Sequence, residues 1–357
     1  MKHIFIVHSP ITYLSSLGVI ISENIDLKNV LFISAGFNIE GPVKINIVDI
    51  SAKKILSKNG LIKNLRIFYD RGYYLNKTIN NFLHDNKFIA YVSVFNDTER
   101  FTVVHPACLD FHFIEEGVEA YHTSHSLSHF STAHNSIFSY EMGIKGFFQR
   151  VKSSIRRFGY TEAITSIPIF SIAFRHDNSK LFYCFSEESY PFAENKRILS
   201  FTSIKKRFFP DTDFSKFKDI QDQCLWIGNV SMFQNSQMFK DFLNNYLLKF
   251  LEKEHFKKLY IRFHYRESIE QKDVMIDFLK RNRIEYETIS DSIIMELFLL
   301  SVPRCNCIGF NSSLLLYAAH MGHRSISFSN QRNNNIDIRF PAYKKYVNYL
   351  DTEYFNK

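Results

Sequence analysis

The sequence is poor in several residues whose abundance marks particular classes of protein. Its 357 residues include 12 glycines, 8 prolines and one tryptophan. So little glycine and proline disfavours a glycine-rich β protein and favours a compact α/β enzyme with short connections. No run of about eighteen apolar residues occurs, so we expect no transmembrane helix. The amino-terminal segment also lacks the apolar core and the small-residue cleavage site of a signal peptide.

Cysteine is scarce as well, and its spacing matches no zinc or redox motif. The five cysteines are Cys108, Cys184, Cys224, Cys305 and Cys307. Their number is odd, and the last two form only a C-x-C pair. We therefore expect reduced thiols in a cytoplasmic protein.

Apolar residues and positive charge are plentiful. The hydrophobic fraction of 45% is enough to fill the cores of two domains and argues against wholesale disorder. The formal net charge of +8 attracts polyanions such as nucleic acid, anionic lipid head groups, nucleotide phosphates or acidic glycans. The sequence contains no zinc finger and no aromatic RNA-binding motif, so we expect no nucleic-acid partner.

Strand-like and helical segments alternate along the chain. The pattern predicts strands over residues 2–7, 30–34, 65–69, 88–95, 110–114, 181–185, 224–230, 258–263, 285–289, 305–309 and 324–328. It predicts helices over residues 13–21, 73–84, 238–253, 271–282, 292–300 and 312–320. This alternation indicates two Rossmann-like α/β domains, each built on a parallel, doubly wound sheet.

We expect the first domain to span residues 1–190, with an excursion over 120–180 that is rich in serine, histidine and basic residues. The second domain is expected over 191–330, and residues 331–357 are expected to cross back over the first domain as a tail. Ligands of doubly wound sheets gather at the carboxyl ends of the strands. We therefore expect the functional residues at those ends.

The first candidate cluster is Glu115-Glu116-Gly117, directly after a predicted strand. Two carboxylates at a strand end, followed by a glycine that permits a tight turn, make a plausible base site. A base is needed wherever an acceptor hydroxyl must lose its proton as it attacks. A solvated acidic turn would give the same sequence pattern.

The second cluster runs from Arg262 to Glu267 and contains His264, Tyr265 and Arg266. Histidine titrates near neutrality and the guanidinium fork matches phosphate oxygens, so these residues suit a departing phosphate. A surface turn whose glutamate caps the next helix is the alternative.

The third cluster is Gly309-Phe310-Asn311-Ser312-Ser313, where a predicted strand ends and a helix begins. Either serine is a natural N-cap, and the helix amino terminus offers free N–H groups and the positive end of the helix dipole. Such an end binds anions, most simply phosphate. An ordinary N-cap is the alternative.

The order of these clusters resembles that of bacterial sialyltransferases, in particular the capsule polysialyltransferases of glycosyltransferase family 38 and their lipooligosaccharide and marine-bacterial relatives. Those enzymes share an acidic-acidic-Gly motif, a later His-Pro motif and a still later Ser or Ser-Ser motif. Glu115-Glu116-Gly117 matches the first motif and Ser312-Ser313 the third. His264 matches the histidine of the second, but Tyr265 stands in place of proline.

The resemblance implies a GT-B fold and an inverting transfer of sialic acid from CMP-sialic acid to a capsule or lipooligosaccharide glycan, with no metal and no cofactor. Glu115 or Glu116 would be the general base, and His264 would stabilise or protonate the leaving phosphate. Ser312 and Ser313 would hold that phosphate, with Gly309, Asn311, Tyr265 and Arg266 in the donor site. Glu296, or Asp291 as its rival, would bind the ribose.

Two alternatives to sialic acid transfer stay open at this point. One is transfer of another CMP-linked sugar, such as legionaminic acid or Kdo, which the Tyr265 departure would accommodate. The other is a non-catalytic glycan- or lipid-binding protein of capsule assembly that keeps only the fold.

Three further features are weighed beside the motifs. His122, His125, His129 and His134 are irregularly spaced, so we read them as a polar loop rather than a metal site.

Residues 145–158 place aromatic side chains on one helical face and cationic ones on the other, as a helix at an anionic membrane surface does. This predicts peripheral contact with the inner face of the cytoplasmic membrane, although a helix packed on its own domain is equally consistent.

Ser9, in the turn His8-Ser9-Pro10, is a candidate substrate contact in the cleft between the domains, or simply a turn residue.

Overall fold

The computed structural model describes residues 1–34, 46–50, 74–93, 97–103, 105–121, 180–191, 193–228, 233, 235–264, 266–310, 312–329, 341–350 and 354. The chain forms two compact units, Met1–Phe208 and Phe209–Lys357. Several predictions fall outside the described residues: the strand over 65–69, most of the excursion over 120–180 with its histidines and the helix 145–158, and the site residues Tyr265 and Asn311.

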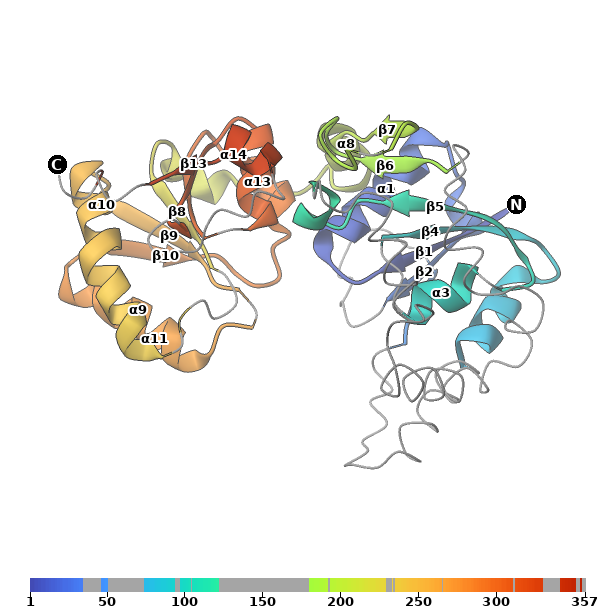
Figure 1. Cartoon of the computed structure of the whole chain (residues 1–357), viewed down its shortest axis with the longest axis horizontal. Helices are drawn as coiled ribbons and strands as arrows, with labels where there is room; N and C mark the ends of the chain where they lie inside the picture. The colour runs from blue at the N-terminus through green and yellow to red at the C-terminus, as the bar shows by residue number, and fades with distance from the viewer. Residues whose placement is uncertain are drawn as a thin grey trace, which may run out of the picture. The chain divides into compact units, whose positions relative to one another are not determined.

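The first unit is built on a parallel seven-stranded sheet in the order β3-β2-β1-β4-β5-β6-β7 (Figure 1). The strands are β1 (Lys2–Val7), β2 (Val30–Ser34), β3 (Asn46–Asp49), β4 (Phe88–Val92), β5 (Cys108–Ile114), β6 (Phe182–Cys184) and β7 (Lys196–Ile198). The chain order reverses between β1 and β4, where β1 pairs with both β2 and β4. This is the topological switch point of a doubly wound sheet, beside which ligands bind.

Helix α1 (Pro10–Ser22) follows β1 and begins earlier than the predicted helix over 13–21. Pro10 occupies the first helical turn, where a missing N–H costs nothing and the fixed φ suits a helix. Ser9 is the N-cap, and its side chain and that of Thr12 satisfy each other's backbone N–H groups as a capping box. The turn after β1 is therefore fixed by hydrogen bonds of its own.

The second unit is built on a parallel six-stranded sheet in the order β10-β9-β8-β11-β12-β13. Its strands are β8 (Cys224–Ile227), β9 (Lys258–Arg262), β10 (Glu285–Thr288), β11 (Asn306–Gly309), β12 (Arg324–Ser327) and β13 (Asn348–Tyr349). Numbered from β8, this is the order 3-2-1-4-5-6 of dinucleotide-binding folds, with its switch point between β8 and β11.

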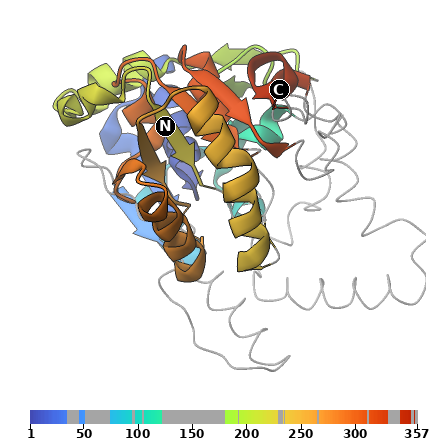
Figure 2. The same ribbon diagram turned by 90° about the vertical axis from the view of Figure 1, so that its left-hand side faces the viewer.

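A large aromatic core covers one face of the second sheet. Trp226 from β8 packs against Phe242, Phe310 and Phe328, with ring centroids about 6 Å apart. Phe242 comes from a long helix composed of α9 (Ser236–Phe242), a π-helical turn (Leu243–Leu247) and α10 (Leu248–Lys253). Figure 2 shows this helix side by side with α11 (Ile269–Arg281). Among the described residues, no helix is both long and apolar enough to cross a bilayer.

Shorter helices complete both units: α3 (Asp97–Val103), α8 (Phe201–Phe208), α12 (Met295–Leu299), α13 (Ser313–His320) and α14 (Pro341–Tyr346), with helical residues 74–83 in the first unit. The sequence did not predict α3, α8, α14, β3, β7 or β13. These elements have six to eight residues in the helices and two to four in the strands, too few for a hydrophobic period to emerge.

The structure places the end of the first unit at Phe208 rather than at residue 190. Residues 191–208 belong to the first unit rather than to the second, because β7 pairs with β6 and α8 packs on α1. Gly18 of α1 allows that packing, since a Cβ there would lie 2.9 Å from the Leu199 side chain. The described part of the tail 331–357 belongs to the second unit, where α14 contacts α13 and β13 pairs with β12.

Gly309, at the end of β11, provides a test of the second sheet. An added Cβ would lie 2.5 Å from the carbonyl oxygen of Ile227, its partner on β8. We expect Gly309→Ala to destabilise the second unit by about 1–3 kcal/mol, because backbone must shift to relieve the clash. The measurement is thermal unfolding of the full chain.

The matched control is Gly322→Asn. Gly322 has φ +90° and open space around its Cα, and asparagine tolerates positive φ better than other residues do. We expect this variant to unfold within about 1 kcal/mol of the wild type. Equal stability of Gly309→Ala and wild type would contradict the tight approach of β8 and β11.

Candidate active site

Three acidic or basic side chains meet at the carboxyl edge of the first sheet. His8 follows β1, Glu99 lies in the first turn of α3 after β4, and Glu116 follows β5. These three strands are neighbours in the sheet. The Nε2 atom of His8 lies 2.8 Å from Oε1 of Glu116, and Nδ1 lies 3.9 Å from Oε1 of Glu99. An imidazole therefore stands between two carboxylates at the switch point.

Burial differs among the three side chains. Glu99 is only 2% exposed, whereas His8 and Glu116 keep 20% and 27% of their side-chain surface. The Oε2 atom of Glu116 is covered and accepts no hydrogen bond from the described residues. A carboxylate oxygen that accepts no hydrogen bond from the described residues is suited to accept one from the hydroxyl group of a bound ligand.

The electrostatics of this group favour a protonated histidine. Burial lowers the pKa of His8, but the hydrogen bond to Glu116 and the charges of Glu116 and Glu99 outweigh it. The pKa of His8 is therefore raised above its usual value of about 6.5. The raised pKa favours the protonated form of the His8 ring beside Glu116.

Glu115 has a different, structural position. Its side chain is fully buried, and its Oε2 accepts hydrogen bonds from Phe185 N (2.8 Å) and Ser189 Oγ (2.9 Å). Its backbone carbonyl accepts a bond from Ser15 Oγ of α1 at 3.1 Å. Glu115 thus joins β5 to the loop after β6. The two adjacent glutamates are not a solvated turn, and they do not share one role.

Ser9 lies beside His8, but its hydroxyl is engaged in helix capping. Its Oγ accepts from Thr12 N at 3.3 Å, and Thr12 Oγ1 accepts from the N–H groups of both His8 and Ser9. The capping box therefore fixes the backbone that presents His8. From this turn, the side chain that lies with Glu99 and Glu116 is therefore that of His8.

In the second unit, His264 lies in a tight turn at the carboxyl end of β9. Its N–H donates to Oε2 of Glu267 at 2.6 Å, and Arg266 N donates to its Nδ1 at 3.1 Å. Gly228, after β8, lies against this turn, because a Cβ there would be 2.7 Å from His264 N. Burial raises the pKa of Glu267 to about 7. Glu267 holds the turn, and Ser268 rather than Glu267 caps α11.

The imidazole of His264 is poised as a neutral hydrogen-bond donor. Burial and the positive charges of Arg266 and Arg262 lower its pKa. Since Nδ1 accepts the Arg266 N–H, the neutral ring carries its proton on Nε2. This state suits hydrogen bonding to a phosphate better than full proton transfer.

Arg262 and Glu296 lie near the same strand end. Arg262 Nη1 donates to Ser290 O and to Asp291 Oδ1, both at 2.7 Å. Glu296, in the first turn of α12, is only 8% exposed, and burial raises its pKa to about 6 against the opposing charge of Arg262. Of the two candidate ribose ligands, Asp291 is engaged by Arg262 and Glu296 is the buried carboxylate.

The serine motif is hydrogen-bonded to a residue from the carboxyl-terminal part of the chain. Ser312 is the N-cap of α13, and its Oγ accepts from Leu314 N at 3.3 Å. Tyr343 of α14 accepts a hydrogen bond from Ser312 N (2.7 Å) and donates one to Ser312 O (2.8 Å). Ser313 opens the helix as its first residue and is partly exposed. The capping prediction for Ser312 is confirmed.

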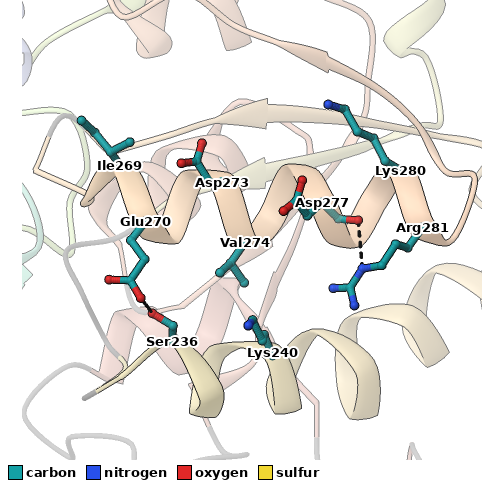
Figure 3. Close-up of a pocket in the computed structure, with 9 residues that line it drawn as sticks. All are labelled: Ser236, Lys240, Ile269, Glu270, Asp273, Val274, Asp277, Lys280 and Arg281. Atoms are coloured by element: carbon teal, nitrogen blue, oxygen red, sulfur yellow. Dashed lines mark hydrogen bonds between the residues drawn. The ribbon is translucent and has the colours of Figure 1, made fainter.

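A groove of about 730 Å³ lies elsewhere, between α9 and α11 (Figure 3). Its walls carry Ser236, Lys240, Glu270, Asp273, Asp277 and Arg281. None of the predicted site residues lines it. This groove is therefore separate from the candidate residues at the strand ends.

Sequence reasoning missed His8, Glu99 and Tyr343 as parts of these sites, and it considered Glu267 only as a helix cap. His8 stood in a turn already under consideration, and its position directly after a buried strand was the available signal. Glu99 lies in a helix that was not predicted, and Tyr343 in a segment read as a crossing tail. Their partners are distant in sequence, so no local pattern marks them.

No known protein-family model matches the sequence, and no curated protein matches it either. Solved structures do. The chain is similar to the glycotransferase of kitacinnamycin, with 8% identity and a TM-score of 0.53 over 98% of this chain and 86% of that one. It is similar to a putative UDP-N-acetylglucosamine 2-epimerase from Listeria monocytogenes, with 10% identity and a TM-score of 0.53 over 92% and 79%.

A third similar structure is the 2,6-sialyltransferase of Vibrionaceae Photobacterium sp. JT-ISH-224, in complex with the donor product CMP and the acceptor lactose. The identity is 8% and the TM-score 0.50, over 98% of this chain and 78% of that one. Together with the two parallel sheets, these similarities show that the chain has the GT-B fold.

The different roles of the two glutamates can be tested by stability. We expect Glu115→Ala to lower the free energy of unfolding by about 2 kcal/mol or more, because buried donors lose their acceptor. Glu116→Ala should stay within about 1 kcal/mol of the wild type, because its pair with His8 is partly exposed. Thermal and urea unfolding of both variants provide the comparison, and the reverse ranking would contradict the assignment.

The charge state of His8 can be followed by NMR titration of labelled histidines. We expect a pKa above about 6.5 in the wild type and a lower one in Glu116→Gln, because the hydrogen-bonded charge is removed. The folded chain binds this proton more tightly than the unfolded chain. The associated stability is complete below about pH 6.5 and is lost as the pH rises through the folded-state pKa. An unchanged His8 titration in Glu116→Gln would refute the pairing.

Proposed function

We propose that this chain is an inverting glycosyltransferase that moves a sialic acid from CMP-sialic acid to a cell-surface glycan without a metal ion. The observation that carries the proposal is the pairing of His8 Nε2 with Glu116 Oε1 beside buried Glu99. This group stands at the edge of a GT-B sheet where ligands of doubly wound folds bind.

Glu116 is the general base of the proposed reaction. As the acceptor hydroxyl oxygen attacks the anomeric carbon, its proton passes to the carboxylate of Glu116. The bond from the anomeric carbon to the CMP phosphate breaks, and the phosphate leaves with the electron pair. His8 fixes the Glu116 carboxylate through Oε1, and Oε2 is the oxygen that accepts no hydrogen bond from the described residues. Glu99 keeps the imidazole between the two carboxylates.

The second unit supplies the donor side of the proposal. The amino terminus of α13, with Ser312 and Ser313, binds the CMP phosphate through N–H and hydroxyl groups. Neutral His264 donates a hydrogen bond from Nε2 to the same phosphate as charge develops on it. Buried Glu296 accepts hydrogen bonds from the ribose hydroxyls.

The choice of donor rests on motifs rather than on the fold. A sialyltransferase and UDP-N-acetylglucosamine 2-epimerases both share this fold at similar TM-scores, so the likeness does not separate CMP from UDP sugars. Glu115-Glu116-Gly117, His264 and Ser312-Ser313 support CMP-sialic acid. The absence of proline at position 265 leaves legionaminic acid or Kdo as the second donor to test.

A thermal-shift screen of CMP, UMP, UDP and GDP tests the donor class. We expect CMP alone to raise the unfolding temperature, because only a ligand of the folded state stabilises it. Ser313→Ala should reduce the CMP shift and Glu116→Gln should not. A shift with UDP and none with CMP would overturn the donor assignment.

The matching transfer assay separates binding from chemistry. With CMP-sialic acid and a lactose-based acceptor, Glu116→Gln should lose roughly 10²–10⁴-fold in kcat, because the base is gone, while its CMP shift is retained. Legionaminic acid and Kdo donors are assayed in parallel. Wild-type protein that binds glycan but transfers none of the three sugars would identify a non-catalytic binding protein instead.

A further inference from the structure

A separate cluster of reactive side chains lies at the opposite edge of the second sheet from the serine motif. Cys305 precedes β11, Cys307 lies within it, and His323 precedes β12. The three residues are 1%, 0% and 7% exposed. One potential ligand atom from each lies within 4.8 Å of the other two. These are two thiols and an imidazole, all of them buried.

Two of the three distances between these atoms are close to the edges of a tetrahedral metal site, and the third pair, Cys307 and His323, has its ligand atoms within 4.8 Å. Cys305 Sγ lies 3.8 Å from Cys307 Sγ and 3.4 Å from Nδ1 of His323. Zinc binds sulfur at about 2.3 Å and nitrogen at about 2.0–2.1 Å, so tetrahedral angles put two sulfurs about 3.8 Å apart and sulfur and nitrogen about 3.5 Å apart.

The histidine is oriented as metal-binding histidines usually are. Its Nε2 lies 2.8 Å from the carbonyl oxygen of Leu299, which can only accept, so Nε2 carries the proton. Nδ1 then presents its lone pair to the sulfur atoms. A backbone carbonyl that fixes the far nitrogen of a histidine is a common outer partner of a metal ligand. The Cys305 N–H also points at Nδ1, at 3.2 Å, and would have to yield this contact to a metal.

Strand alternation limits the ligand set to these three residues among the described part of this region. Cys224 pairs in register with Asn306 and packs with Ile308 in the aromatic core on the other face of the sheet. Cys224 is therefore a thiol that is buried like those of the cluster but lies outside it. Its substitution serves as a control for loss of a buried thiol.

We propose that Cys305, Cys307 and His323 bind a thiophilic metal ion. We assign this ion as Zn²⁺, because its charge balances that of two thiolates. The two thiols release their protons to solvent on binding, and two thiolates and one Zn²⁺ sum to zero charge, as a buried site requires. The ion joins the start of β11 to the start of β12. Through Leu299 it also steadies the end of α12, the helix that carries Glu296.

This ion has a structural role, separate from the proposed transfer chemistry. Cys305 precedes Gly309 by a strand length of roughly 13 Å, so the metal lies away from the serine motif at the carboxyl end. A metal-free transfer reaction and a bound zinc ion are therefore compatible. Failure of either proposal leaves the other standing.

The test uses the full chain, produced with zinc in the medium and purified without chelators. Mass spectrometry of the metal content should find about one zinc per chain. Removal of zinc by a strong chelator should lower the unfolding temperature, and added ZnCl₂ should restore it. Cobalt substitution should give the near-ultraviolet absorption of thiolate ligands. The double variant Cys305→Ser/Cys307→Ser should lose the zinc, whereas Cys224→Ala should keep it.

Wild-type protein with less than about a tenth of a zinc per chain, and no thermal response to ZnCl₂ after chelation, would overturn the proposal. An intact mass and a thiol titration that reveal a Cys305–Cys307 disulfide would do the same. Since these measurements use only wild-type protein, they decide the question even if the double variant fails to fold.

Discussion

Parallel strand pairing is the constraint on which both candidate sites depend. When every strand of a sheet runs the same way, all carboxyl ends lie along one edge. The pairings β1 with β4 and β4 with β5 therefore bring together His8, Glu99 and Glu116, which are far apart in sequence. The second sheet repeats the arrangement, with the His264 turn after β9 and the serine motif after β11. Two similar sheets thus carry different chemistry at equivalent edges.

The strands that form the sheet interiors could be predicted because they are short, continuous apolar runs. The structure gives β1 and β2 the predicted limits, since their burial is nearly complete and polar or turn residues bound them. The helix over 238–253 was likewise predicted within two residues, although a π-helical turn interrupts it. Edge strands such as β3, whose residues are mostly exposed, carry no such run and were missed.

The candidate site was predictable only in part, for a related reason. Sequence marks Glu115 and Glu116 as a pair, but not which one faces the interior, because that depends on the loop after β6. A carboxylate that receives a backbone N–H and a buried hydroxyl is committed to holding the fold. Its neighbour, hydrogen-bonded to a histidine 108 positions away, is the one that we propose as the base. Contacts between residues that are distant in the sequence give the two glutamates these different positions. The sequence alone does not reveal such contacts.

The hydroxyl group of Tyr343 bonds both backbone polar groups of Ser312, and this has a consequence for how the chain can be shortened. A polypeptide that stopped after β12 would contain every candidate residue of the donor side. It would still lack the phenol that sets the first peptide of α13, leaving that peptide to water. Helix α14 thus holds the start of α13 in place, and it helps to determine the shape of the proposed anion site some thirty residues earlier in the chain.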